Sequence, residues 1–386
     1  MSLNNPFNSR GWCSYEKEQP VGEPLTTPSE PVGNNDLDNV NGDLIVRKNM
    51  IIFDGEGHRF QVKKWLGSGQ FGQVYKCVFI NPPVDWPNRK LAIKISKSTT
   101  DAHNMFQYES QALQYLKKFM PIEDQLLMST YEFSFIYCNH YCIVIELLGN
   151  SLYDELKLNK FKGFSLSYVQ AMLRCILPVL SSLSSLGLMH CDVKPENILK
   201  SSKINEFKLI DFGSCLFSAG NEITYVQSRF YRAPEVVLGL PYDSKVDIWS
   251  LGCVTIEITL GLPLFPAMSE RHLISLINDT IAQIPIGLAE QSPKYHLFFD
   301  LDGNIKSAQV MCDESGEDFA EKFQPYFVEK RLADIFRSYE PLNEEDIRYR
   351  EQLLDLLINM LKVDPFERCT AEEAMDHPFM HIRFPS

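Results

Sequence analysis

The pattern of apolar residues changes once along this 386-residue chain, and that change constrains the fold more than any other feature. Before Gly149, short apolar runs alternate with polar turns, which is typical of strands, and only residues 103–119 have helical periodicity. After Gly149 the pattern is mainly helical, most clearly at 169–186. We therefore predict an α+β chain with two lobes: a small antiparallel sheet with one main helix, then a larger, mainly helical lobe. A cleft is expected at the join, near residues 145–150.

The chain is expected to divide into four segments of different composition. In order they are a flexible tail (1–42), a hairpin segment (43–57), the first lobe (58–148) and the second lobe (149–386). The tail is rich in Asn, Pro, Gly, Ser and Glu. Two apolar runs, Leu44–Val46 and Met50–Phe53, predict the hairpin. Within the second lobe we expect an insert at about 267–325, whose acidic part, 300–323, should be exposed.

Composition and charge exclude several classes of protein. The net charge of −13 argues against a nucleic-acid partner, which needs a basic surface. The ten cysteines show no C-x-x-C spacing for zinc, and reduced thiols predict a cytoplasmic and/or nuclear protein. The first residues lack the basic and apolar regions of a secretion signal. The most apolar window, 248–265, contains Glu257 and Pro263, so it predicts a buried helix with a turn and no membrane partner.

The chemistry is concentrated between residues 190 and 213. Asp192, Lys194 and Asn197 lie within six positions, and Asp211 is followed by Phe212-Gly213. Phosphoryl transfer from a metal nucleotide requires such a set: one acid to accept a hydroxyl proton, a lysine for the phosphate, and an Asn and another Asp for Mg²⁺. The alternative is a loop with solvated charges between two strands. The short apolar runs on either side, which hold the polar groups at fixed separation, favour the catalytic interpretation.

A glycine-rich loop at Gly67–Val74 lies between two predicted strands. Glycines allow backbone amides to approach phosphates closely. A dinucleotide-binding oxidoreductase would share the G-x-G-x-x-G pattern, but it predicts a helix directly after Gly72 and no dependence on Mg²⁺. A phosphate-binding lysine, Lys94, follows on the next strand, with Glu109 of the predicted helix as its partner. Alone, Lys94 would be interpreted as an edge residue with a solvated amine, and Glu109 as a surface residue.

Together these motifs resemble the signature set of the eukaryotic protein kinases, over roughly residues 58–384. The resemblance implies the bilobal protein kinase fold, with ATP and Mg²⁺ as cofactors. It implies that Asp192 is the catalytic base, that Lys194 and Lys94 contact phosphates, that Glu109 holds Lys94, and that Asn197 and Asp211 bind the metal. The implied ATP-binding residues are Leu66, Gly67, Ser68, Gly69, Gln70, Phe71, Gly72, Val74, Ala92, Lys94, Ile145, Glu146, Leu148 and Leu199. For Leu66, Val74, Ala92 and Leu199 ordinary core packing is an alternative that is compatible with this role.

Two further features resemble one family of kinases, the dual-specificity tyrosine-regulated kinases. The usual arginine before the catalytic aspartate is Cys191, and the segment Thr224–Glu235 matches the family closely. The resemblance implies self-phosphorylation of Tyr225, with Arg229 and Arg232 as its phosphate clamp and Arg232 also shaping a pocket for a proline after the target residue. The alternative for Tyr225 is a buried aromatic residue. Residues 41–46 and 158–167 favour the Yak-type branch, although the hinge has features of the LAMMER-type kinases.

The resemblance also implies partners and scaffold contacts. The substrates would be Ser or Thr residues of proteins, proline-directed, with Asp154 and Glu196 recognising an upstream arginine. The enzyme is expected to be a monomer. Three positions would serve as scaffold, with Glu235 pairing with Arg368 and Asp247 anchoring the catalytic loop. A redox bridge between Cys191 and Cys215 is an alternative to two inert buried thiols. A pseudokinase scaffold is the remaining rival, and it would require the loss of a catalytic residue.

Overall fold

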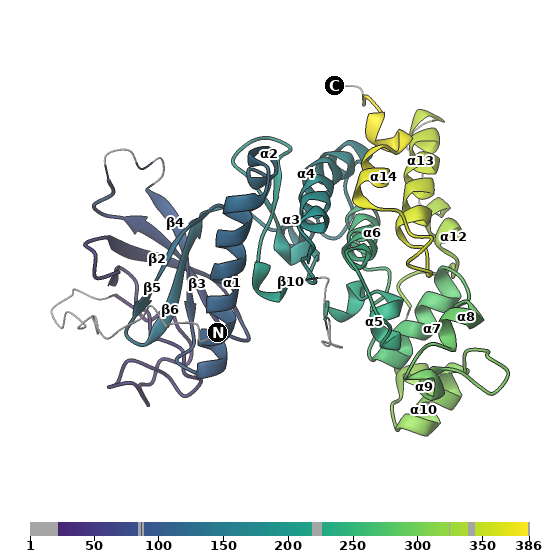
Figure 1. The fold of residues 1–386 in the computed structure, drawn as a ribbon, viewed down its shortest axis with the longest axis horizontal. Helices are drawn as coiled ribbons and strands as arrows, with labels where there is room; N and C mark the ends of the chain where they lie inside the picture. The colour runs from purple at the N-terminus through teal and green to yellow at the C-terminus, as the bar shows by residue number, and fades with distance from the viewer. Residues whose placement is uncertain are drawn as a thin grey trace, which may run out of the picture. The chain divides into compact units, whose positions relative to one another are not determined.

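The structure, a computed structural model, describes residues 22–83, 86, 89–217, 226–323, 325–338 and 344–384. These residues form two compact units (Figure 1). The N-lobe comprises the described residues up to Lys118 together with Ser129–Leu147, and the C-lobe comprises Phe119–Met128 and the residues from Leu148 onward. The predicted boundary lies one residue from the observed one. Phe119–Met128 was predicted to lie in the first lobe but belongs to the C-lobe. The oxygen of Leu127 there accepts a hydrogen bond from the backbone of Leu209 (3.0 Å).

The described part of the N-lobe contains one six-stranded sheet whose paired strands are all antiparallel. Its strands are β1 (Ile51–Phe53), β2 (Arg59–Gly69), β3 (Gly72–Phe79), β4 (Lys90–Ser96), β5 (Tyr131–Tyr137) and β6 (His140–Glu146). They lie in the order β1-β2-β3-β4-β6-β5, and α1 (Thr100–Phe119) lies along the sheet (Figure 1). The small antiparallel sheet with one main helix is as predicted.

The two faces of this sheet are covered by different parts of the chain. Successive strand residues point to opposite faces, so Tyr75, Cys77 and Phe79 of β3 share one buried face. The core on that face also contains Leu44, Val46 and Met50 of the segment that precedes the sheet. On the other face, a Cβ atom on Gly72 would clash with the Phe106 ring of α1. The sheet therefore needs both covers to exclude water from its apolar side chains.

The predicted flexible tail is therefore wrong for residues 22–42. Thr26, Asp38 and Asn39 are only 1%, 2% and 3% exposed. The Thr26 hydroxyl donates to the Leu44 oxygen (2.9 Å) and lies 2.7 Å from the Tyr75 hydroxyl. A polar composition alone predicts solvation, but here the polar groups are satisfied by hydrogen bonds to the lobe. Residues 1–21 lie outside the described residues.

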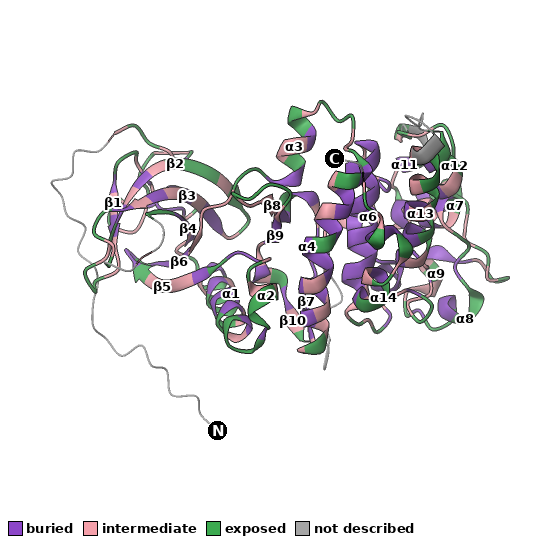
Figure 2. Ribbon diagram, turned by 90° about the horizontal axis from the view of Figure 1, so that it is seen from above, coloured by how far each residue is buried: buried purple, intermediate pink, exposed green. Residues whose placement is uncertain are grey.

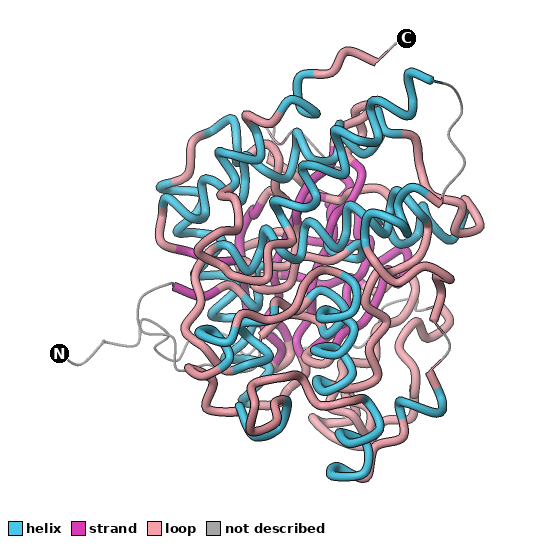
Figure 3. Tube along the Cα trace, turned by 90° about the vertical axis from the view of Figure 1, so that its right-hand side faces the viewer, coloured by secondary structure: helices cyan, strands magenta, loops and turns pink. Residues whose placement is uncertain are grey.

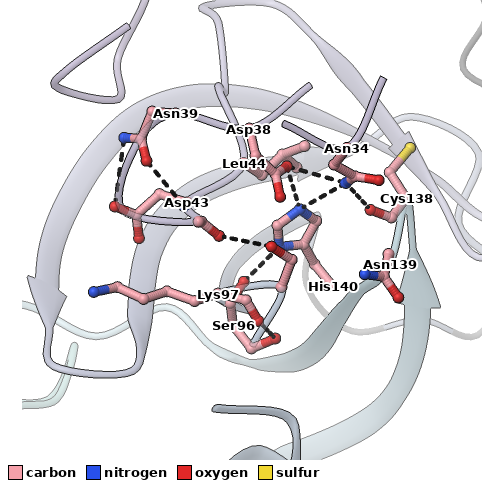
Figure 4. A network of polar contacts seen from close by, with 12 residues as sticks. Asn34, Asp38, Asn39, Asp43, Leu44, Ser96, Lys97, Cys138, Asn139 and His140 are labelled. Carbon is pink, nitrogen blue, oxygen red and sulfur yellow. Dashed lines mark hydrogen bonds and ion pairs between the residues drawn. The ribbon is translucent and has the colours of Figure 1, made fainter. Parts of the chain in front are cut away.

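His140 is the centre of the polar network that holds this segment (Figure 4). Its Nδ1 lies 2.7 Å from the Ser96 oxygen, and its Nε2 lies 2.9 Å from Oδ1 of Asp38. A carbonyl oxygen and a carboxylate are both acceptors, so the ring is held between two acceptors on opposite sides. Asn34 also donates to Asp38 (3.0 Å) and to the Cys138 oxygen (2.7 Å). The network joins the segment to β4 and to the turn between β5 and β6.

The predicted hairpin within 43–57 is also different in the structure. β1 pairs with β2, so the turn at Asp54–His58 connects these two strands instead of two runs inside the segment. The run Leu44–Val46 faces the preceding segment, where Asp38 bridges to Leu44 and Leu25 donates to the Val46 oxygen (2.8 Å). The apolar pattern identified both runs but could not identify their partners, which lie outside the predicted hairpin.

Helices dominate the C-lobe, as predicted (cyan in Figure 3). The helices are α2 (Ile122–Gln125), α3 (Leu152–Leu158), α4 (Leu166–Ser185), α5 (Pro234–Leu238), α6 (Lys245–Leu260), α7 (Glu270–Thr280), α8 (Ile286–Ala289), α9 (Tyr295–Phe298), α10 (Ala308–Ser315), α11 (Phe319–Lys322), α12 (Leu332–Arg337), α13 (Glu344–Met360) and α14 (Ala371–Met375). Short 3₁₀ turns are η1 (Pro195–Asn197), η2 (Phe212–Ser214), η3 (Arg229–Tyr231) and η4 (Pro378–His381). Two small sheets pair β7 (Leu188–Met189) with β10 (Leu216–Phe217) and β8 (Ile198–Lys200) with β9 (Phe207–Leu209).

Helix α6 forms the centre of the C-lobe and is buried along its length after Lys245 (Figure 2). Gly252 allows close packing there, since a Cβ atom would lie 2.9 Å from the Leu361 side chain. The helix ends at Gly261, whose φ of +90° favours glycine. The predicted buried helix with a turn is thus confirmed. Helix α4 is the one described helix that is long and apolar enough to cross a membrane, but 67% of that stretch is buried, as in a core helix of a soluble fold.

The insert is less exposed than its acidic composition predicts. Met311, Cys312 and Phe319 are 0%, 5% and 2% exposed, so the prediction of an exposed 300–323 is wrong at these positions. The Phe319 ring stacks on His272 of α7, with 4.8 Å between the centroids. Burial lowers the pKa of His272 to about 4. A few buried apolar side chains on α10 and α11 are enough to attach the insert to α7.

Candidate active site

Lys94 and Glu109 form a bidentate ion pair within the N-lobe. Lys94 is on β4 and Glu109 is on α1, and Nζ lies 2.6 Å from Oε1 and 2.7 Å from Oε2. The side chains are 14% and 5% exposed. The amine therefore faces a buried carboxylate, which excludes the alternative of an edge lysine with a solvated amine. The predicted partnership of these two residues is confirmed.

The glycine-rich loop is the turn of the hairpin between β2 and β3. Gly67 pairs with Val74, Ser68 with Gln73 and Gly69 with Gly72, so Gln70 and Phe71 form the tip. No atom lies within 4 Å of where a Cβ would be on Gly67 or Gly69, which leaves the backbone accessible. A strand begins at Gly72, whereas the dinucleotide-binding alternative needs a helix there. The hairpin therefore favours the kinase interpretation of the loop.

Strand register places four predicted ATP-binding residues on one face of the sheet. Val74 pairs with Lys94, and Ala92 pairs with Ile145. Ala92 and Lys94 are two positions apart on β4, so their side chains and those of their cross-strand partners share a face. Ala92 is 5% exposed, which is compatible with core packing as well.

The other predicted ATP-binding residues differ in their exposure to solvent and in the lobe to which they belong. Leu66 is 43% exposed, so core packing does not describe it. Glu146 follows in β6, and its carboxylate accepts a hydrogen bond from Thr130 (3.2 Å). Leu148 and Leu199 belong to the C-lobe, where Leu199 lies on β8 and bridges to Ser151. Their contribution to an ATP site stays a prediction.

Asp247 of α6 anchors the catalytic loop of the C-lobe. Its carboxylate accepts the backbone N–H groups of His190 (2.7 Å) and Cys191 (2.9 Å), as predicted for a loop anchor. His190 adds a second constraint, since its Nε2 lies 3.0 Å from the Ile210 oxygen and its Nδ1 accepts from the backbone of Asp192 (3.2 Å). These bonds fix the backbone that leads into Asp192 and tie it to Ile210, the residue before Asp211.

Asp192 lies at the centre of three polar side chains of the C-lobe. Its Oδ2 accepts from Lys194 Nζ (2.7 Å) and from Asn197 Nδ2 (3.1 Å). Its Oδ1 accepts from the Ser228 hydroxyl (2.7 Å), and Lys194 also donates to that hydroxyl (3.2 Å). A carboxylate has about four acceptor sites, so capacity for a substrate hydroxyl remains. The predicted members Asp192, Lys194 and Asn197 are thus brought together.

Asn197 and Asp211 have the chemistry of magnesium ligands. Nδ2 of Asn197 donates to the Asp192 oxygen (2.9 Å) and to its carboxylate, which leaves Oδ1 as the atom that can bind a cation. Asp211 has a φ of +66°, a strained conformation that is common at functional sites. Among the described residues no three His, Cys, Asp or Glu side chains form a metal site. Two oxygen ligands suffice for Mg²⁺ when substrate phosphates supply the others, so the residues fit the ion.

Comparison with known proteins agrees with this geometry. The protein kinase domain family matches residues 60–380. The chain belongs to the protein kinase family. Relatives among curated proteins place this kinase with the Yak1 and DYRK-type enzymes. Protein kinase domains bind ATP together with a divalent metal ion.

Three relatives illustrate how far the similarity extends. Dual specificity protein kinase YAK1 of Saccharomyces cerevisiae is 36% identical, over 95% of this chain and 47% of its own length. Serine/threonine-protein kinase ppk15 of Schizosaccharomyces pombe is 35% identical, over 95% of this chain and 70% of its own. Dual specificity tyrosine-phosphorylation-regulated kinase 4 of Homo sapiens is 34% identical, over 86% and 59% respectively. The kinase thus spans about half the length of the YAK1 relative.

The arginines predicted to clamp a phosphate are already engaged in this kinase. Arg232 is 1% exposed, and its three nitrogens donate to the oxygens of Val226 (2.9 Å) and Gln227 (2.8 Å) and to Glu270 (2.8 Å). Arg229 donates to the Met268 oxygen (2.7 Å). Tyr225 lies outside the described residues, so the clamp stays a prediction. Through these bonds Arg232 orders the backbone at Val226 and Gln227.

Asp154 and Glu196 are the candidates for recognising an arginine upstream of the target residue. They differ in their contacts and in their exposure to solvent. Asp154 caps helix α3, accepting from Ser151, and pairs with Lys157 (2.8 Å). Burial tends to raise its pKa, but the hydrogen bonds from Lys157 and Ser151 lower it. Glu196 is exposed on η1. Of the two, Glu196 is the better placed to meet a substrate cation.

Sequence reasoning missed two residues that hold the loop. Ser228 bridges Asp192 and Lys194, and Gln227 donates from its backbone to the Cys191 oxygen (3.0 Å) and from its side chain to the Val246 oxygen (2.9 Å). Both lie within the segment that resembles the family, so their position in that segment was the available signal. Their roles depend on distant partners, which the sequence does not show.

The structure bears on two predictions about buried groups: the pair of Glu235 with Arg368, and the thiols of Cys191 and Cys215. Glu235 and Arg368 form a bidentate pair (2.6 and 2.9 Å) with side chains 1% and 0% exposed. Cys191 and Cys215 are both free and buried. Burial raises the pKa of Cys191 far above its ordinary value and that of Cys215 to about 12, which makes both thiols unreactive. Inert thiols, and not a redox bridge, describe this state of the kinase.

Proposed function

We propose that this chain is an ATP- and Mg²⁺-dependent protein kinase that phosphorylates Ser and Thr residues and phosphorylates its own Tyr225. The observation that carries the proposal is the arrangement around Asp192. Its carboxylate is oriented by Ser228, Lys194 and Asn197 and retains capacity to accept the proton of a hydroxyl group. The names of the YAK1 and DYRK-type relatives support dual specificity for this chain.

Each residue has a role that follows from its contacts. Lys94, held by Glu109, would neutralise phosphate charge, and Lys194 would do the same for the transferred group. Asn197 and Asp211 would hold Mg²⁺, which supplies charge neutralisation on the phosphates when bound. Asp192 orients the hydroxyl and takes its proton. An intact set of these residues argues against the pseudokinase rival.

Specificity and context belong to the same proposal. Arg232 orders the backbone of Val226 and Gln227, which supports a rigid pocket for a proline after the target residue. Glu196 supports recognition of an upstream arginine. We further propose a monomer of the cytoplasm and/or the nucleus, with no nucleic-acid or membrane partner. This proposal is based on the acidic net charge and on the ten cysteines, which show no C-x-x-C spacing.

Replacing the base tests the activity directly. Asp192→Asn should lower kcat on a Ser/Thr peptide about 10²–10⁴-fold, because the amide cannot accept the proton. Asp279→Asn, an equally conservative change at an exposed residue, is the matched control and should have no effect. Thermal melting of both variants separates catalysis from folding. Full activity of a well-folded Asp192→Asn protein would refute the proposal.

Self-phosphorylation has a separate test. Intact mass and peptide mapping of recombinant protein should place one phosphate on Tyr225 in the wild type and none in Lys94→Arg. A phosphate on Tyr225 in both proteins would contradict self-phosphorylation in cis.

A further inference from the structure

A hollow of about 650 Å³ opens on the C-lobe, apart from Asp192 and its partners. Its walls are one side of α4, the turn between β8 and β9, and the chain segment 381–384. The volume lies within the range of ligand sites, about 300–1,000 Å³. None of its lining residues belongs to the catalytic set described above.

The charge of this hollow is opposite to that of the whole chain. Arg174, His381 and Arg383 line it, and no Asp or Glu does. The chain as a whole has a net charge of −13. Arg383 and His381 form no ion pair within the described part of the chain, and both are exposed. The two arginines form a local positive charge on an acidic protein, which attracts an anionic ligand.

Hydrogen bonds hold the walls of the hollow in place. Gln170 donates to the oxygens of Phe379 (2.6 Å) and Ile382 (3.1 Å), and Arg174 uses Nη2 for the Met380 oxygen (2.6 Å). A guanidinium has five N–H donors, so Arg174 can bind a carboxylate as well. The wall is therefore built before any ligand arrives, which lowers the entropy cost of binding.

Apolar groups accompany the cations. Ile382 and Phe384 are part of the lining, and the Phe384 ring packs against Tyr349 with 5.1 Å between the centroids. Ile204, next to the lining residue Asn205, is 92% exposed in the turn between β8 and β9. Carboxylate binding beside apolar contacts fits a peptide that carries both acidic and apolar side chains, more than it fits a bare inorganic anion.

We propose that this hollow is a docking site for an acidic segment of a protein substrate, distinct from the segment that receives the phosphate. The inference rests on the proposed kinase function for the identity of the ligand as a substrate. Arg174 and Arg383 bind its carboxylates, and the apolar residues contact a neighbouring aliphatic side chain. Docking of this kind would raise the effective concentration of the phosphorylated segment near the enzyme.

Selection of peptides on the wild type and on a variant with reversed charges tests the site without knowledge of the natural substrate. The probe is a phage-displayed library of random 12-residue peptides, selected on the immobilised full chain and on Arg174→Glu/Arg383→Glu. Arg89→Glu/Lys90→Glu, with the same change in charge at two exposed N-lobe residues, is the matched control. Selected peptides are then synthesised and their affinities measured by fluorescence anisotropy.

The wild type and the control should enrich peptides rich in Asp and Glu with a Leu or Ile nearby. Loss of one charge-assisted contact should weaken binding about tenfold, and the double variant should weaken it about 100-fold. Arg383→Glu alone, at a residue with no wall contact, should give the tenfold loss even if the double variant misfolds. Acidic peptides that bind all three proteins equally, or no acidic enrichment on the wild type, would overturn the docking site.

Phosphorylation of a short peptide without an acidic segment is measured on the same proteins. It should be equal in the wild type and in all three variants, since none touches the catalytic set. An inactive wild type that still selects acidic peptides would refute the proposed kinase function but not the site.

Discussion

Each lobe contains a buried carboxylate that joins distant parts of the chain, and the two differ in their partners. In the C-lobe, Glu235 binds Arg368, whose charge is permanent. In the N-lobe, Asp38 binds His140, whose charge depends on its proton. The first pair lies inside the region that matches the kinase family, at 60–380, whereas Asp38 lies before it. The segment before the family match is therefore attached by a pair of two titratable groups, whereas the C-lobe pair contains a permanent cation.

The strongest test of this contrast is to break the permanent pair. Arg368→Met should destabilise the kinase by about 3–5 kcal/mol, because it leaves the Glu235 carboxylate buried without a cation. The double variant Glu235→Met/Arg368→Met should lose less, since no charge is then unpaired. Urea denaturation measures both. A single variant as stable as the wild type would mean that the pair contributes no constraint.

Glu257 offers a second test in the same lobe, through its pH dependence. Burial raises the pKa of this α6 carboxyl to about 7, while the hydrogen bond from Tyr231 (2.7 Å) lowers it and the nearby Glu196 raises it further. Its ordinary value is 4.5, so the folded state keeps a proton that the unfolded state loses between about pH 4.5 and 7. Stability therefore falls as pH rises through this window, by at most about 3 kcal/mol.

Glu257→Gln should remove that fall, because the neutral amide has no proton to lose. The measurement is the unfolding free energy at pH 5 and pH 8 for the wild type and the variant. Relative to that of the wild type, the unfolding free energy of the variant should be larger at pH 8 than at pH 5. Parallel pH profiles for the two proteins would show that Glu257 ionises as an ordinary carboxyl.

The titratable pair of the N-lobe should respond in the opposite direction. Burial tends to raise the pKa of Asp38, but hydrogen bonds from His140, Ser98 and Asn34 outweigh it and lower the pKa. A lowered pKa stabilises the folded state at neutral pH, and this stabilisation is lost as pH falls through the folded pKa. Asp38→Asn should therefore cost about 1–3 kcal/mol at pH 7 and nothing at strongly acidic pH.

The matched control for that prediction is Asp36→Asn, which changes an exposed carboxyl of the same segment. Urea denaturation at pH 7 should separate the two variants. Hydrogen exchange of the backbone around Leu44 should also become faster in Asp38→Asn alone, since the segment loses its anchor. Equal stability of both variants would mean that residues 22–50 are held by apolar contacts only.

How much the sequence predicts follows the same division between the lobes. Lys94, Asp192, Asn197 and Asp211 belong to short motifs whose residue types state their chemistry, so their roles and the pairing of Lys94 with Glu109 could be predicted. The two strands β2 and β3 followed from the apolar runs on either side of the glycine loop. Within the catalytic segment, spacing along the chain was a sufficient guide.

The residues that the sequence did not explain are those whose partners lie far away. Asp38 and His140 are 102 positions apart, and no local pattern connects them. Residues 22–42 looked solvated because they are polar, although their side chains bond to one another and to the lobe. Ser228 was missed for a related reason, since a hydroxyl is common in loops and only its distances to Asp192 and Lys194 show its role.

The smallest effect should come from an exposed pair in the same segment as Asp38. Lys48 and Glu23 are 3.4 Å apart with side chains 51% and 70% exposed. Such pairs contribute about 0.2–1 kcal/mol at low ionic strength, and salt screens them. Glu23→Gln should therefore destabilise the kinase within that range at low salt and not measurably at 0.5 M salt, whereas the Asp38→Asn deficit should persist because water and ions are excluded there. If the two deficits respond to salt alike, Asp38 is not shielded, and the contrast between the two lobes reduces to one of degree.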